Sequence, residues 1–236
     1  MSDERSRAKD LAEKLSFQGS EVFLDGERIL KVPGDCETRT QIRMLGVCDH
    51  KIGDWDVFVG TGSCCHGHVL ALDGTRLDQI LTPDLCVEDM LPMAVDHKKT
   101  GFSTSGALLV TGQGCAGGGV RLMSVYYPQV IDIMPTEEFR GMYDGRRDGW
   151  VIPRLRADPE TGRITLDLHR GGYRLRPGMS RDPTLPSILL DSKAEEFHVS
   201  DDLHSTLDLT ERLARTGVDV EKSIDLSKDY HRIRQR

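Results

Sequence analysis

Short segments rich in apolar and β-branched residues, separated by turn residues, fill the middle of this chain and predict a series of β-strands. The alternation is clearest at 163–169, where three aliphatic side chains alternate with polar ones, so one face of this strand is expected to be buried. Asp-Gly dipeptides mark turns between strands. The predicted strands are Val22–Leu24, Arg28–Val32, Gln41–Val47, Trp55–Val59, His66–Leu72, Ala107–Thr111, Val120–Tyr126, Gln129–Met134, Trp150–Arg156 and Arg163–His169.

Helical patterns are predicted near the two ends of the sequence and once in the middle. Residues 4–15 are good helix formers with an apolar stripe. Leu85–Val95 predicts a helix that ends near Pro92. In the tail, Ser205 is expected to cap a helix that runs to Thr216 and stops at Gly217, and Glu221–Arg234 predicts a further helix.

These elements predict an α+β fold. Its middle is expected to be mostly antiparallel β, barrel- or sandwich-like, with helices at the N- and C-terminal ends. Because no break in composition suggests a linker, residues 1–236 are expected to form a single domain.

Charge and hydropathy exclude several classes of protein. The net charge of −7 argues against nucleic acid as the main partner. The longest apolar runs are a few residues, whereas a membrane span needs about 20. The start of the sequence lacks an apolar signal region, so a cytoplasmic location is expected.

Arginine is concentrated in one stretch of this acidic sequence. Residues 140–181 hold ten arginines and five acids, and a guanidinium group matches carboxylate or phosphate geometry. Residues two apart on a strand share a face, so Arg154 with Arg156, and Arg174 with Arg176, are predicted to bind a small anionic substrate.

Cysteine and histidine suggest a metal site rather than disulfides. The six cysteines include no C-x-x-C pair and are expected to be reduced. His66 and His68 would share one face of a strand and hold a divalent metal, zinc or iron, with Cys64 or Asp73 as third ligand and His50 as a candidate fourth. The alternative is that the cysteines pack in the core as small apolar side chains and that the His-x-His spacing arises by chance.

Parts of this cluster resemble motifs of known families. Gly60-x5-His66-x-His68-x4-Asp73 resembles the first motif of the cupin β-barrels, with Asp in place of that family's Glu, and the second cupin motif is missing. Cys48-x-His50 followed by Cys65-x-x-His68 is similar to the Rieske iron–sulfur spacing. The run Cys-x-His-Gly-His is similar to a zinc-pterin synthase motif.

Two further motifs carry candidate chemistry. Gly112, Gly114 and Gly117 form a literal G-x-G-x-x-G, which in a Rossmann unit binds a dinucleotide. Here, however, Gly118 and Gly119 are poor helix formers, so a closely packed loop is expected, with Cys115 as a candidate reactive thiol.

The segment before Gly101 brings an imidazole next to two amines. His97 is a candidate acid/base group and Lys98 a candidate electrophile, against the alternative of a solvated turn.

Together these features predict a metal-dependent cytoplasmic enzyme, a hydrolase or lyase, acting on a small anionic molecule. The metal would act as a Lewis acid or water activator. One alternative is a non-enzymatic binding or assembly protein with a structural Cys/His metal site. Another is a nucleotide-dependent oxidoreductase that uses Gly112–Gly117. The sequence is compatible with a homo-oligomer.

Overall fold

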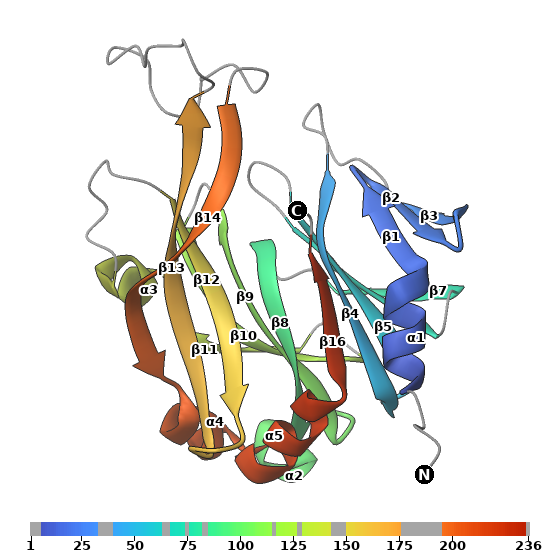
Figure 1. Ribbon diagram of the computed structural model, residues 1–236. Helices are drawn as coiled ribbons and strands as arrows, with labels where there is room; N and C mark the ends of the chain where they lie inside the picture. Colours follow the sequence, from blue (N-terminus) through green and yellow to red (C-terminus); the bar gives the residue numbers. More distant parts are fainter. Residues whose placement is uncertain are drawn as a thin grey trace.

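The computed structural model describes residues 6–32, 40–62, 67–73, 76–81, 85–114, 117–126, 129–142, 150–175 and 195–234. Within them the chain is mostly antiparallel β-structure arranged in four sheets, with short helices between and beside them (Figure 1). This agrees with the predicted β-rich α+β class.

A small N-terminal layer, made of one helix and a three-stranded sheet, covers one face of the sheet that contains β4 (Gln41–Ile52) and β5 (Trp55–Gly62). Helix α1 (Arg7–Lys14) is capped by Ser6, whose hydroxyl accepts from Lys9 N. The hairpin sheet then consists of β1 (Leu15–Gln18), β2 (Glu21–Leu24) and β3 (Glu27–Lys31). Its β2–β3 turn has positive φ at Asp25 and Gly26, as a tight hairpin requires. Side chains such as Val22 pack on the next sheet in a hydrophobic cluster.

That next sheet, here called the β4 sheet, has the order β16-β4-β5-β6-β7. Its strands are β4 (Gln41–Ile52), β5 (Trp55–Gly62), β6 (Val69–Asp73), β7 (Arg76–Leu81) and β16 (Tyr230–Arg234). Strand β5 is buried along its whole length, because the N-terminal layer covers one face and the main core covers the other.

The β8 sheet has the order β11-β10-β9-β8-β15. It contains β8 (Cys86–Val95), β9 (Gly106–Gly114), β10 (Gly117–Ser124), β11 (Val130–Met134) and β15 (Val218–Asp219). It shares the main hydrophobic core with the β4 sheet, and the indole Nε1 of Trp55 in β5 donates to Val125 O at 3.0 Å.

The β13 sheet completes the core. Strands β12 (Trp150–Asp158), β13 (Arg163–Leu175) and β14 (Glu195–Asp208) form an antiparallel sheet, and β12 lies next to β8 (Figure 1). The remaining helices are α2 (His97–Thr100), α3 (Thr136–Met142), α4 (Thr210–Thr216) and α5 (Val220–Lys228).

The prediction of a helix over Leu85–Val95 is wrong, because Cys86–Val95 forms the strand β8. Most of its side chains are buried, so both faces contact apolar neighbours and the sequence shows no clean alternation. Pro92 lies opposite Leu108 of β9 on one side of β8. On the other side β15 pairs with β8 at Ala94 and Val95 and not at Pro92, so no strand there needs the N–H that proline lacks.

Two predictions at the C-terminal end also need correction. Ser205 lies inside β14, and α4 begins at Thr210, whose N–H donates to Asp208 Oδ1 at 2.9 Å. The predicted stop at Gly217 is confirmed by its left-handed φ of 98°. The helix predicted over Glu221–Arg234 ends at Lys228, and its second half is the strand β16.

None of the helices in the described ranges has the length and apolar character needed to cross a membrane.

Candidate anion-binding site

Strand β16 directs three large side chains toward the main core. Tyr230, Arg232 and Arg234 share one face because side chains alternate along a strand. Tyr230 is accommodated by Gly46 of β4: a Cβ at that position would lie 2.1 Å from the tyrosine Oη. The guanidinium of Arg232 lies 5.5 Å from the Tyr230 ring centroid, and this stacking helps to fix its direction.

The two arginines of β16 meet Asp89 of β8, which has no exposed surface. Arg232 Nε lies 3.1 Å and Arg234 Nη2 lies 2.9 Å from Asp89 Oδ1. The carboxylate also accepts from Met90 N at 2.9 Å and from Leu155 N at 2.8 Å. Asp89 therefore has hydrogen-bonded and ionic partners on three strands, and it anchors the site.

A third arginine reaches the same place from β12. Arg154 Nη1 donates to the carbonyl oxygen of Glu88 at 2.8 Å. Burial lowers the pKa of Arg154, and the positive charge of Arg234 lowers it further. The guanidinium groups of Arg154 and Arg234 are thus close enough to interact in a partly buried environment.

Glu88 lies among these cations without pairing with them. Burial raises the pKa of its carboxyl, while Arg43 and Arg154 oppose that shift. Among the described residues, no ion pair or hydrogen bond joins its side chain to an arginine. A carboxyl of this kind is a common feature of functional sites, although structural charge networks show it as well.

The positive groups exceed the negative ones. We call Arg43, Arg154, Arg232 and Arg234, with Glu88 and Asp89, the arginine cluster. Among the described residues, four guanidinium groups face two carboxyl groups, and a partly buried excess of charge is costly unless an anion compensates for it. In addition, Nε of Arg43 and Nε of Arg234 are buried and have no hydrogen-bond partner in the described part of the chain. Unsatisfied buried donors and excess positive charge both suit an oxyanion.

The predicted arginine pairs are only partly brought together. Arg154 belongs to the cluster, but Arg156 is 59% exposed and pairs with Asp167 at 3.5 Å. The side chain of Arg174 and the whole of Arg176 lie outside what the structure describes. Sequence reasoning missed Arg232 and Arg234 because they were placed in a helix, although the spacing of YHRIR also fits a strand face.

The three predicted metal ligands that the structure describes, His50, His68 and Asp73, are distributed over both ends of the β4 sheet. Cys64 and His66 lie outside the described residues. His68 precedes β6, and its N–H donates to Thr61 Oγ1 at 2.9 Å. Asp73 is at the other end of β6, five residues or about 16 Å of strand away, and forms an ion pair with Lys51. The structure therefore does not bring Asp73 and His68 to one ion, whose ligands lie about 2 Å from it.

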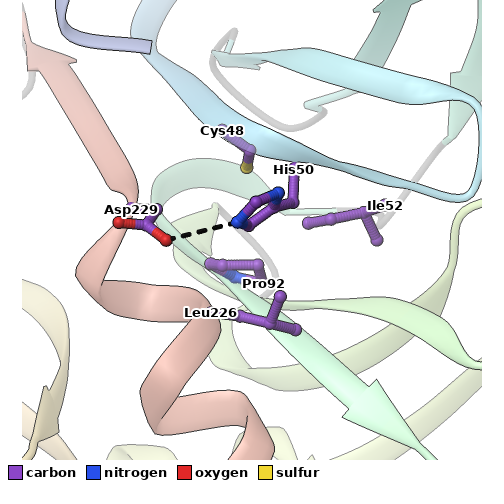
Figure 2. Close-up of a pocket in the computed structure, with 6 residues that line it drawn as sticks. All are labelled: Cys48, His50, Ile52, Pro92, Leu226 and Asp229. Carbon is purple, nitrogen blue, oxygen red and sulfur yellow. Dashed lines mark ion pairs between the residues drawn. The ribbon is translucent and has the colours of Figure 1, made fainter. Parts of the chain in front are cut away.

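His50 is on the Asp73 side of the sheet, in a shallow pocket beside α5. Figure 2 shows its ring directed at Asp229, with Nε2 3.6 Å from Oδ2. Cys48 lines the same pocket, together with Ile52, Pro92 and Leu226. Burial, with Asp56 and Asp49 nearby, raises the pKa of the Cys48 thiol far above its ordinary value, so this thiol stays protonated. Among the described residues, no three His, Cys, Asp or Glu side chains form a metal-binding group.

His97 and Lys98 are exposed in α2, a single turn capped by Asp96. Strand β8 separates Glu88 from Val95 by seven residues, about 23 Å, so α2 lies far from the arginine cluster. Cys115 lies outside the described residues.

The glycine motif forms part of a β-hairpin, where the sequence predicted a closely packed loop. Gly112 and Gly114 end β9, Gly117 begins β10, and Gly117 pairs with Gly114. No helix begins here, so the helix N-terminus that holds a pyrophosphate in a dinucleotide site is missing from this position. Packing explains these residues: a Cβ at Gly112 would lie 1.7 Å from Cys86 O, and one at Gly118 would lie 2.5 Å from the Phe139 ring.

A cleft of about 190 Å³ lies beside this hairpin. Its charged pair, Arg121 and Asp132, is joined across β10 and β11 at 3.2 Å. Because Arg121 and Asp132 compensate each other's charge, this cleft is a weaker candidate for ligand binding than the arginine cluster is. It is lined by Gly118, Gly119, Arg121, Asp132, Met134, Pro135, Thr136 and Glu137.

Comparison with known proteins gives no further guidance, because no protein-family model, curated protein or solved structure matches the chain.

Proposed function

We propose that this protein binds a small anionic molecule, a carboxylate or a phosphate compound, at the arginine cluster. The observation that supports this most directly is the excess of guanidinium groups over carboxyl groups, with buried N–H donors of Arg43 and Arg234 lacking acceptors among the described residues. The four arginine side chains are each partly exposed, although the Nε donors of Arg43 and Arg234 are themselves buried.

A metal-dependent reaction on that anion, hydrolysis or elimination, is the second part of the proposal. His68 adjoins Thr61, which pairs with Ile42, the neighbour of Arg43. A Cβ at Gly62 would lie 3.2 Å from Arg43 Nε. His68 therefore lies at the same end of the β4 sheet as Arg43, and a metal held by His68, with His66 as the second predicted ligand, would act there as a Lewis acid or water activator.

Anion binding is tested by titrating inorganic phosphate into Arg154→Leu and Arg156→Leu variants. Both arginines are on β12, but one joins the cluster and the other is exposed. We expect Arg154→Leu to weaken binding by about tenfold or more, because charge-assisted hydrogen bonds contribute about 1.5–3 kcal/mol. Arg156→Leu should leave the Kd within about twofold. Equal Kd values in the two variants, or no binding by the parent protein, would contradict the proposal.

The metal is tested separately by elemental analysis of the purified protein and of its His68→Ala variant. We expect a stoichiometric divalent metal in the parent protein and its loss in the variant. A protein free of metal, or full metal content in His68→Ala, would remove the second part of the proposal and leave anion binding untouched.

A further inference from the structure

Glu88 is the one group of the arginine cluster whose presence a simple anion does not explain. A carboxyl at the centre of an anion site repels the anion and reduces its affinity. Asp89, by contrast, is fully occupied by Arg232, Arg234 and two backbone N–H groups. The side chain of Glu88 contributes no comparable anchoring contact within the described chain.

The cluster therefore offers two kinds of unused groups. Nε of Arg43 and Nε of Arg234 are buried N–H donors that need acceptor oxygens. The carboxylate of Glu88 is an acceptor that needs a donor, and Arg43, Arg154 and Arg234 are all close enough to affect its pKa. One ligand can satisfy both kinds of group if it carries anionic oxygens and an O–H group.

We infer that Glu88 makes this site selective for oxyanions that carry a hydroxyl group, such as hydrogen phosphate or a 2-hydroxy carboxylate, over oxyanions that carry none. The inference rests on the proposed anion binding. The arginines would bind the anionic oxygens, and the Glu88 carboxyl, in its ionised form, would accept the ligand's O–H. A ligand without that proton would place its oxygen against the carboxylate, and rejection would come from this repulsion.

The experiment compares anions of nearly equal shape. At about pH 8 phosphate and arsenate carry a proton, whereas sulfate and selenate carry none. Lactate and propionate form a second matched pair, with and without a 2-hydroxyl group, and this pair distinguishes a carboxylate ligand from a phosphate-like one. Calorimetric titrations at low ionic strength give a Kd for each anion.

In the parent protein we expect the hydroxyl-bearing member of at least one pair to bind about tenfold or more tightly than its partner. In Glu88→Gln the amide can donate a hydrogen bond and carries no charge, so the ratio should fall toward one. Glu211→Gln is the matched control, because Glu211 is an exposed glutamate that pairs with Arg215 on α4.

The outcomes separate the inference from the proposed function. Equal affinities within every pair would overturn the selectivity and leave anion binding in place. A ratio of Kd values that is the same in Glu88→Gln as in the parent protein would also overturn the role of Glu88. Failure of all six anions to bind would overturn both. If Glu88→Gln does not fold, Glu88→Ala replaces it with the same expected fall in the ratio, and equal affinities in the parent protein still overturn the inference.

Discussion

Two aspartates on different sheets, Asp56 and Asp89, have almost no contact with solvent, and arginine accompanies each of them. Removing a carboxylate from water costs several kcal/mol, so each charge has to be compensated by close contacts. Asp89 has partners on β8, β12 and β16, whereas Asp56 on β5 is paired with Arg7 of α1 at 2.7 Å. The Arg7 side chain is itself largely exposed, so an accessible residue contributes directly to compensating a buried charge.

This predicts that Arg7→Ala destabilises the fold more than its surface position suggests. Arg28 provides the control: it is 57% exposed against 60% for Arg7, and it pairs with Glu21 at 2.8 Å. The partners differ, because Asp56 is 1% exposed and Glu21 is 30% exposed. In urea unfolding we expect Arg7→Ala to lower the free energy of unfolding by about 2 kcal/mol and Arg28→Ala by about 0.5 kcal/mol or less. Similar losses in both variants would show that burial of Asp56 is not what makes Arg7 important.

Elements with a local signal could be predicted from the sequence, and those defined by distant neighbours could not. Helix α1 has an apolar stripe, the β2–β3 hairpin has Asp25-Gly26, and β12–β13 has a polar turn, so all three were predicted. Strand β8 is covered on both faces, and nothing in its own ten residues distinguishes it from a buried helix. Strand β16 exists because it pairs with β4, where Tyr230 lies opposite Cys48, a residue 182 positions earlier in the chain.

The glycine hairpin β9–β10 shows how close packing between strands can imitate a nucleotide motif. Gly112→Ala would place a Cβ 1.7 Å from the backbone oxygen of Cys86, so β8 and β9 would have to separate. We expect a loss of about 3 kcal/mol in the free energy of unfolding, because overpacking against backbone cannot be relieved by a rotamer change. Gly101→Ala is the control: it meets no atom within 4 Å and should cost about 1 kcal/mol for its positive φ of 72°. Equal costs measured by urea unfolding would refute the packing explanation.

Across the whole molecule, the candidate site forms where three sheets converge. Arg43 comes from β4, Glu88 and Asp89 from β8, Arg154 from β12, and the remaining arginines from β16. The sequence suggested an anion-binding role for Arg154, because arginine is abundant around it. It could not suggest Arg232, whose Nη2 donates to Leu155 O at 2.9 Å across 77 residues, because that proximity depends on how the sheets pack.

Because the three sheets converge at this point, Asp89 connects them through its own contacts. Its carboxylate holds Arg232 and Arg234 of β16 and accepts Leu155 N of β12, so all three strands depend on one negative charge. Asp89→Asn removes the charge, leaves the arginines uncompensated, and should lower the free energy of unfolding by about 3 kcal/mol. Hydrogen exchange measured by mass spectrometry should also show faster exchange in peptides covering β12 and β16, because their links to β8 are weakened. Asp132→Asn is the control, since Asp132 is exposed and pairs with Arg121 at 3.2 Å, and it should change stability by less than about 0.5 kcal/mol. An Asp89→Asn protein with unchanged stability and unchanged exchange in β12 and β16 would mean that apolar packing alone holds the three sheets together.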